Sequence, residues 1–246
     1  MGRSKLYRYA ENDALPNVIQ PGRPEEAATF LLKGKWSRDH FHNEQPLTLE
    51  LGCGKGEYTL GMGRAFPDCN FIGVDIKGAR IWRGAKTALN ENLGNVAFLR
   101  TPIERIEQCF GKDEVSDIWI TFPDPQPTSR REKKRLTGHA FLHRYHKILR
   151  PGGRIHLKTD SAELFAYTME VLEHLRIRPE IVCEDVHGSL DEIPDMVRSI
   201  RTHYEQLFLA KGKNIHYLRF SLPDDLPPPP KKKKKQTQHI QDTIKP

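Results

Sequence analysis

The chain has 246 residues, of which 37% are hydrophobic, and a formal net charge of +7, which suits one α/β domain with additions or two small domains. It has no apolar stretch of membrane-spanning length and no apolar leader at its first residues, so neither a membrane protein nor a signal peptide is expected. Four cysteines without a Cys-x-x-Cys pair, and histidines without a ligand pattern, predict a reduced cytoplasmic protein without a metal site.

Residues 1–45 are polar and basic, and they contain Pro16, Pro21 and Pro24. Residues 25–35 are expected to form a short helix. We expect this N-terminal extension to cover an edge of the domain that follows, or to reach toward a substrate.

From residue 46 to residue 222, apolar strands alternate with helical stretches. Strands are expected at 47–51, 70–74, 96–99, 116–120, 154–158, 180–183 and 214–220. Helices are expected at 57–65, 77–91, 131–149, 162–175 and 197–211, and in the second of them Ile81, Ala85 and Ala88 share one face. Strands separated by helices of this size predict βαβ units and a parallel sheet in an α/β domain.

A glycine-rich turn, Glu50-Leu51-Gly52-Cys53-Gly54-Lys55-Gly56, joins the first strand to its helix. Its Gly-x-Gly-x-Gly spacing differs from that of dinucleotide-binding proteins and is typical of methyltransferases that use S-adenosylmethionine. Asp75 ends the next strand, where a carboxylate can accept hydrogen bonds from both ribose hydroxyls of an adenosine. The alternative is a tight turn beside a solvated acid. The strand, turn and helix around the glycines favour the cofactor.

The acid before the turn, Glu50, can hold the amino group of the cofactor or orient the loop, and an ion pair with Lys55 or Arg80 is the alternative. Thr101 and Pro102 follow the third strand at the usual position of an adenine contact, which backbone groups can make. We therefore predict an S-adenosylmethionine site made of Glu50, Gly52, Gly54, Gly56, Asp75, Ile76, Thr101, Pro102 and Asp124.

The most informative segment follows the strand at 116–120 and begins Phe122-Pro123-Asp124-Pro125. An acid in a proline-stiffened turn at a strand end lies where open α/β sheets bind their ligands. Five cations follow within six residues, Arg130, Arg131, Lys133, Lys134 and Arg135. Such a cluster predicts contacts with phosphates, and a solvated helix start is the alternative. An acid at a strand end with a basic cluster directly after it predicts an enzyme that acts on a nucleic acid.

After Pro223 the composition changes, and four prolines precede the lysine run Lys231 to Lys235 and a polar end. We expect residues 223–246 to be a disordered tail. The lysine run has two open interpretations, an RNA-binding arm or a solvated segment.

Together these motifs resemble the tRNA (guanine-N7)-methyltransferase family between residues 47 and 220. The resemblance rests on the glycine-rich turn, on Phe-Pro-Asp-Pro with its basic continuation, on Pro151-Gly152-Gly153 with Thr159-Asp160, and on Thr202-His203-Tyr204-Glu205. It implies a Rossmann-like class I methyltransferase fold, with a mostly parallel seven-stranded sheet and helices on both faces. Departures from the family are Gln126 for Trp, Thr128 for Lys, and Thr101 for Asn or Asp. Arg130 or Arg131 is the candidate to supply the charge missing at Thr128.

The resemblance implies methylation of guanine N7 in tRNA, at the variable-loop guanine. N7 carries a lone pair and no proton, so the reaction needs alignment of the reactants and no general base. Methyl transfer puts positive charge on the purine, and a carboxylate beside the base stabilises that charge. Asp124 fits this role and is the predicted catalytic residue.

By the same resemblance, Asp160 and residues 202–205 contact the tRNA. The alternatives are a helix cap for Asp160 and a solvated helix face for Glu205. The predicted substrate-binding residues are Thr128, Arg130, Arg131, Lys133, Lys134, Arg135, Asp160, Thr202, His203, Tyr204 and Glu205.

Other functions remain as alternatives: methylation of rRNA, protein or a small molecule, NAD-dependent oxidation, and RNA binding without catalysis. The basic cluster argues against a small molecule, the glycine spacing against NAD, and the joint presence of Glu50, Asp75 and Asp124 against loss of catalysis. The chain is similar to the short bacterial members, which act without the WD-repeat partner of eukaryotic members. We therefore expect tRNA as the partner, no obligate protein partner, and a monomer or homodimer. The tRNA species is not predicted.

Overall fold

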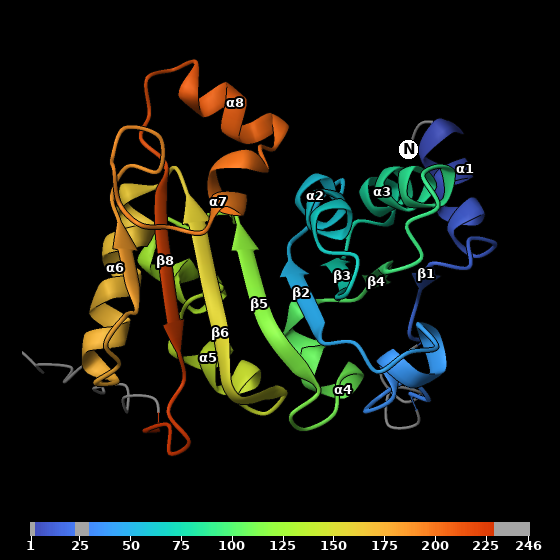
Figure 1. Cartoon of the computed structure of the whole chain (residues 1–246), viewed down its shortest axis with the longest axis horizontal. Helices are drawn as coiled ribbons and strands as arrows, with labels where there is room; N and C mark the ends of the chain where they lie inside the picture. Colours follow the sequence, from blue (N-terminus) through green and yellow to red (C-terminus); the bar gives the residue numbers. More distant parts are fainter. Residues whose placement is uncertain (1–2, 23–29, 229–246) are drawn as a thin grey trace, which may run out of the picture.

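A computed structural model of the chain describes residues 3–22 and 30–228. Its centre is an eight-stranded sheet in the order β1-β4-β3-β2-β5-β6-β8-β7 (Figure 1). The strands are β1 (Val18–Ile19), β2 (Leu47–Leu51), β3 (Asn70–Asp75), β4 (Val96–Arg100), β5 (Val115–Thr121), β6 (Leu149–Thr159), β7 (Ile181–Cys183) and β8 (His216–Ser221). All neighbours are parallel except β8, which runs antiparallel to β6 and β7.

The strand order places a topological switch point between β2 and β5. From β2 the chain builds outward through β3 and β4, and it then crosses to β5 and β6 on the other side of β2. Ligands of open α/β sheets bind outside the carboxyl ends of the strands at such a point. The site is therefore expected above β2 and β5.

Helices cover both faces of the sheet. One face carries α2 (Glu57–Ala65) and α3 (Gly78–Asn90), and the other carries α4 (Ile106–Cys109), α5 (His139–His146) and α6 (Ala162–His174). Side chains alternate along β5, so that Ile118 and Ile120 join the core under α5 and α6, whereas Trp119 joins the core under α2. The buried face of α3 carries Ile81, Ala85 and Ala88, as predicted.

The N-terminal extension covers the edge of the sheet. Helix α1 (Arg3–Asn12) lies against α3, where the Asn12 Nδ2 atom donates to the Gly78 carbonyl at 2.9 Å, and the two-residue strand β1 pairs with β4. This strand is the eighth one, which the prediction of seven missed because two residues carry no periodic pattern. The helix predicted at 25–35 is wrong for residues 30–35, which form turns. Residues 25–29 lie outside the described residues.

The helix predicted at 131–149 is wrong in its first half. Residues Ser129–Lys134 form a short 3-10 helix, η4, and α5 begins only at His139. Gly138 between them has an extended backbone, with φ −77° and ψ 157°, which interrupts helical hydrogen bonding. Leu149 already belongs to β6, opposite Val115. The basic cluster therefore lies on a short turn and not along a helix face.

The helix predicted at 197–211 is two helices, α7 (Asp195–Ser199) and α8 (His203–Leu209). The backbone between them is extended at Ile200 and Thr202. The buried ammonium of Lys158 binds the carbonyls of Val197 and Ile200 at 2.6 and 3.1 Å, and these bonds replace those that a continuous helix would make. The break turns α8 over the carboxyl edge of the sheet.

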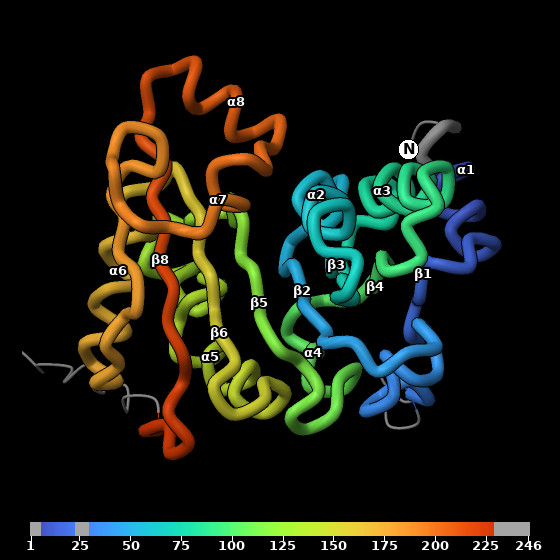
Figure 2. Tube along the Cα trace, viewed as in Figure 1, coloured from blue at the N-terminus to red at the C-terminus, as the bar shows by residue number. Residues whose placement is uncertain are grey.

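Strand β8 carries the chain back to the amino ends of β5 and β6, where residues 222–228 follow without regular structure (Figure 2). The His146 Nε2 atom lies 3.1 Å from the Pro223 carbonyl oxygen and fixes this segment to the end of α5. The run Lys231 to Lys235 lies outside the described residues. Within the described ranges, no helix combines the length and apolarity that a membrane crossing needs.

Candidate active site

A cleft of about 480 Å³ opens above the carboxyl ends of β2 and β5, at the switch point. The glycine-rich loop forms one wall, the turn after β5 forms the floor, and the start of α8 forms the opposite wall. The lining residues are Glu50, Gly52, Cys53, Gly54, Lys55, Glu57, Lys77, Arg80, Thr121, Phe122, Pro123, Asp124, Pro125, Asp160, Thr202, His203, Tyr204 and Phe208. The cleft therefore brings together the two motifs that carry most of the functional prediction.

The glycine-rich loop needs glycine for its backbone conformation. Gly52, Gly54 and Gly56 have φ of 78°, 58° and 75°, in the left-handed region that other residues rarely adopt. A Cβ atom on Gly56 would lie 2.5 Å from the Phe98 ring, whereas one on Gly54 would meet nothing within 4 Å. The loop is thus packed closely below and open above, where a ligand can approach its backbone.

Glu50 is buried beneath the loop, with 2% of its surface exposed. Its carboxylate accepts hydrogen bonds from the Thr59 backbone N–H at 2.8 Å and from the hydroxyls of Thr59 and Thr121. Burial raises the pKa of Glu50 to about 7 against the opposing effect of these bonds. Neither Lys55 nor Arg80, the alternative partners, is bonded to it. Glu50 orients the start of α2 and the end of β5 toward each other.

The other predicted cofactor residues lie along the same sheet edge. The Asp75 carboxylate accepts the backbone N–H groups of Gly54 at 3.0 Å and Lys77 at 2.8 Å. Ile76, which follows it, is 54% exposed. Asp75 lies opposite Arg100 in the sheet, so Thr101 and Pro102 follow at the same edge. Neither of these two residues, nor Asp75 or Ile76, forms the wall of the 480 Å³ cleft, which they flank.

The turn after β5 holds two strained residues around Asp124. Phe122 and Gln126 have φ of 47° and 48°. Left-handed conformations of this kind cost about 1–3 kcal/mol each outside glycine and occur at ligand sites where surrounding contacts enforce them. Here the Phe122 N–H donates to the Lys158 carbonyl at 2.8 Å, and the Gln126 N–H donates to Asp124 Oδ1 at 3.1 Å. The strain presents the exposed Asp124 to the cleft.

The structure corrects the predicted role of Arg135, which was expected to bind phosphate with its four basic neighbours. Its side chain is buried, donates to the carbonyls of Pro125 and Gln126 at 3.2 Å, and pairs with Glu163 at 2.7 Å. Its guanidinium also lies 4.3 Å from the centre of the Tyr167 ring. Arg135 therefore braces the Asp124 turn against α6 and is not available to a phosphate.

The rest of the basic run is accessible. Arg130, Arg131, Lys133 and Lys134, called here the η4 cluster, are exposed, and none forms an ion pair with a described residue. Thr128 is also exposed and precedes η4. The solvated helix start that was the alternative is partly right, because the cluster is solvated, but it lies on a 3-10 turn attached to the active-site loop. Its unneutralised charge is directed to solvent beside the cleft.

Glu205 is the second correction. It is fully buried, and its carboxylate accepts from Lys158 Nζ at 2.8 Å and lies 2.8 Å from His187 Nε2. Burial lowers the pKa of Lys158, and the Glu205 charge opposes that shift. The solvated helix face that was the alternative is therefore wrong, and the predicted substrate contact of Glu205 stays a prediction. The pair instead fastens α8 to β6.

Thr202, His203 and Tyr204 lie on the cleft wall, and their predicted contact with tRNA stays a prediction. The Thr202 hydroxyl caps α8 by accepting the Glu205 N–H at 3.2 Å, and the His203 N–H donates to Glu57 of α2 at 2.6 Å. The second bond ties the two walls of the cleft together. Tyr204 is 52% exposed, and its ring lies 6.4 Å from that of Phe208, which lies 6.0 Å from that of Phe122. These three rings form an aromatic wall.

Asp160 also lines the cleft, where it pairs with Lys213 at 2.6 Å. It is not the helix cap that was its alternative, because Ser161 caps α6 by accepting the Leu164 N–H. The Asp160 side chain therefore contributes to the wall of the cleft and not to the cap of α6.

Sequence reasoning missed several cleft residues, namely Glu57, Lys77, Arg80 and Phe208, and the buried Lys158 beneath them. Phe208 lies four residues after Tyr204 on a helix, a spacing that could have indicated it. Lys158 carried one signal, a charged residue at the end of a predicted core strand. Among the described residues, no group of His, Cys, Asp and Glu side chains is arranged to hold a metal ion.

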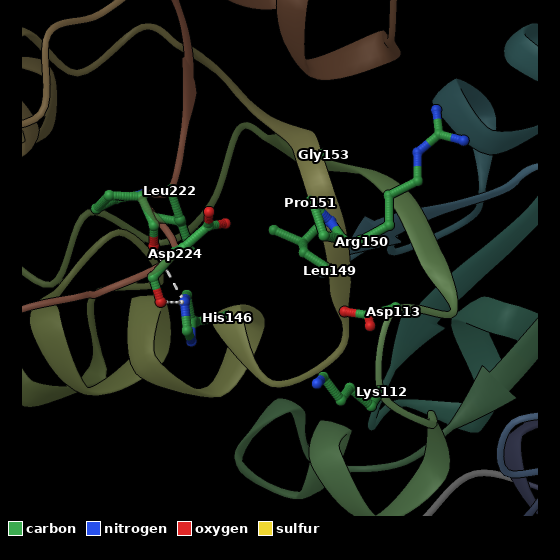
Figure 3. Close-up of a pocket in the computed structure, with 10 residues that line it drawn as sticks. Lys112, Asp113, His146, Leu149, Arg150, Pro151, Gly153, Leu222 and Asp224 are labelled. Atoms are coloured by element: carbon green, nitrogen blue, oxygen red, sulfur yellow. Dashed lines mark hydrogen bonds between the residues drawn. The ribbon is translucent and has the colours of Figure 1, made fainter.

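A second cavity, of about 340 Å³, lies at the opposite edge of the sheet (Figure 3). Lys112, Arg150 and the acids Asp113 and Asp224 surround it, together with Leu222. It lies at the amino ends of β5 and β6, away from the edge where α/β sheets bind ligands. Because it lies at the other end of the strands and shares no lining residue with the cleft, this cavity is not part of the candidate active site.

Comparisons with known proteins give a family and, separately, a fold. A family model described as "Putative methyltransferase" matches residues 44–218. A tRNA (guanine-N(7)-)-methyltransferase of Bacteroides thetaiotaomicron is 48% identical over 92% of this chain and 88% of its own, and one of Christiangramia forsetii is 51% identical over 89% and 98%. The solved structure of the 16S rRNA methyltransferase KamB has a TM-score of 0.57 at 13% identity, covering 76% of this chain and 93% of its own. At that identity the likeness concerns the fold alone.

Proposed function

Because the chain belongs to the tRNA (guanine-N7)-methyltransferase family, we propose that it transfers the methyl group of S-adenosylmethionine to N7 of a guanine in tRNA. The observation that carries this proposal is the shared cleft, in which the glycine-rich loop and Asp124 face each other. The family resemblance favours the variable-loop guanine as the target. The catalytic domain in this proposal spans residues 46–222.

The residues present fit the cofactor. The loop of Gly52, Gly54 and Gly56 is open above Gly54, Asp75 lies beside it, and the Glu50 carboxylate lies beneath it. Asp75 would hold the ribose hydroxyls, Glu50 the amino group, and Ile76 with Thr101 and Pro102 the adenine. When bound, S-adenosylmethionine supplies an electrophilic sulfonium methyl group.

Asp124 acts on the base. Its Oδ1 atom holds the Gln126 N–H, and no described residue pairs with its charge. The carboxylate would accept the N–H groups at the guanine edge and stabilise the positive charge that develops on the purine. Since N7 carries no proton, Asp124 has none to remove. The aromatic wall of Phe122, Tyr204 and Phe208 offers the base a stacking surface.

The η4 cluster would hold tRNA phosphates beside the cleft, with Arg130 or Arg131 in place of the missing lysine at Thr128. Thr202, His203 and Asp160 would contact the target nucleotide. The cysteines Cys53, Cys69, Cys109 and Cys183 are free thiols, which supports a reduced, cytoplasmic location. The resemblance to the short bacterial members of the family leads us to propose action without an obligate protein partner, as a monomer or homodimer.

The test is incubation of the purified protein with an unmodified tRNA transcript and methyl-labelled S-adenosylmethionine, followed by mapping of the methylated base. Label at guanine N7 supports the proposal. Label at another atom, or transfer to rRNA or protein in preference to tRNA, would overturn it.

A further inference from the structure

Another hollow, of about 410 Å³, directly adjoins the active-site cleft. It lies between the exposed sides of α2 and α3 and the start of α8, and Lys55, Glu57 and His203 line both hollows. Among its other lining residues are Arg64, Arg83 and Arg201. A ligand strand that leaves the cleft on this side passes directly into the hollow.

Three cations of this hollow are unneutralised. Lys55, Arg83 and Arg201 are exposed, and none forms an ion pair with a described carboxylate. Arg64 differs, because Glu91 holds its guanidinium at 2.7 Å. One acid, Glu57, also lines the hollow, and its carboxylate accepts a hydrogen bond from the His203 N–H. We call the surface of Lys55, Arg83 and Arg201 the α3 groove.

Helix α3 continues this charge back to the cleft. Lys77, at its N-cap, and Arg80 line the cleft, and Arg83 and Thr87 line the groove. Residues three and four apart on a helix share one side, so Arg80, Arg83 and Thr87 form a single row. The row runs from the catalytic cleft outward.

The η4 cluster lies on the other side of Asp124. Its turn is fixed to α6, where Tyr167 Oη donates to Glu132 and Arg135 pairs with Glu163. Arg83 of the α3 groove lies on α3, which together with α2 covers the opposite face of the sheet. Two cationic surfaces therefore flank the catalytic turn, one on each side.

We propose that the α3 groove binds the sugar-phosphate backbone of the tRNA on the side of the target nucleotide opposite to the η4 cluster. The proposal rests on the proposed function. A base that enters a cleft must leave its stack, and the strand must then be held before and after it. Unpaired Lys and Arg side chains on both sides supply that hold by displacing counterions from phosphates.

The first test is the double variant R83A/R201A, since neither arginine lines the catalytic cleft. The slope of log affinity for tRNA against log salt concentration should become shallower by about 1.5, because each lost phosphate contact removes roughly 0.7–0.9. The affinity for tRNA should fall at least tenfold at moderate salt, and the affinity for S-adenosylmethionine should not change. Turnover at saturating tRNA should stay near the wild-type rate.

The matched control is K112A/R150A, which removes two exposed cations at the opposite edge of the sheet (Figure 3). It should leave the salt slope unchanged. An unchanged slope in R83A/R201A, or an equal change in the control, would overturn the α3 groove. Because tRNA binding is measured without catalysis, this result is separate from failure of the wild type to methylate N7, which would overturn the proposed function.

A second test places the two surfaces on the RNA. An iron chelate that cleaves nearby RNA is attached to R83C or, in a separate variant, to S129C, both in a Cys69→Ser background. Cleavage on opposite sides of the target guanine is the expected result. Cleavage on the same side, or none from position 83, contradicts the proposal.

Discussion

The two halves of the cleft are held in place by different kinds of contact. The cofactor half, at the ends of β2 and β3, is fixed largely by hydrogen bonds from backbone N–H groups: those of Gly52 and Cys53 both donate to the Val74 carbonyl, at 2.8 and 3.1 Å. The substrate half, at the ends of β5 and β6, is fixed by side chains far apart in the chain, Arg135 with Glu163 and Lys158 with Glu205. Mutations should therefore lower cofactor affinity in the first half, and stability or turnover in the second.

The largest effect should follow Lys158→Met in the substrate half. It leaves the buried Glu205 carboxylate without its cation, which costs about 3–5 kcal/mol of folding free energy. The control is Lys86→Met, which breaks the partly exposed pair with Glu11 and should shift the unfolding midpoint far less. Urea unfolding measures both. Equal midpoints for the two variants would show that the buried pair does not hold this half.

Asp124→Asn should lower single-turnover methylation by about two to three orders of magnitude, the scale of one preorganised electrostatic group. The fold and the affinity for S-adenosylmethionine should be unchanged, because Asn retains an oxygen for the Gln126 N–H. Calorimetry and rapid-quench kinetics separate the two quantities. Methylation near the wild-type rate would remove Asp124 from the mechanism.

In the cofactor half, Asp75→Ala should weaken S-adenosylmethionine binding by roughly 10–100-fold, since charge-assisted hydrogen bonds are worth about 1.5–3 kcal/mol. Asp68→Ala removes an exposed acid before β3 and is the control. If turnover at saturating cofactor fell instead while affinity stayed constant, the division between the two halves would fail.

The smallest effect concerns pH. The pKa of Glu50 is raised to about 7 by burial, so its proton is held in the folded protein at acidic pH, and the stability it contributes is lost as pH rises through about 7. A cationic cofactor favours the ionised carboxylate, so its affinity should rise by about tenfold from pH 6 to 8. Titration calorimetry at both pH values tests this. Glu50→Gln should remove the dependence, and a wild-type affinity independent of pH would contradict the proposed contact.

Much of the cofactor half was predictable because its geometry is local. The positive φ values of Gly52, Gly54 and Gly56 are a property that glycine spacing reveals directly. The strands at 47–51 and 70–74 and the helix at 57–65 were predicted correctly, since their periodicity and breakers lie within each segment. In the substrate half, the sequence predicted the turn that carries Asp124. It did not predict the ion pairs that hold this half, Arg135 with Glu163 and Lys158 with Glu205.

The sequence by itself determined the α/β class, the glycine-rich loop, the Asp124 turn and the presence of a cationic run. Only the tertiary structure decided that Arg135 is buried while Arg130 is exposed, that Glu205 meets Lys158, and that α7 and α8 are separate. It also brought Arg83 and Arg201 into one groove. The physical reason is that turn and helix propensities act between neighbours, whereas burial and charge pairing depend on which distant residues the fold brings into contact.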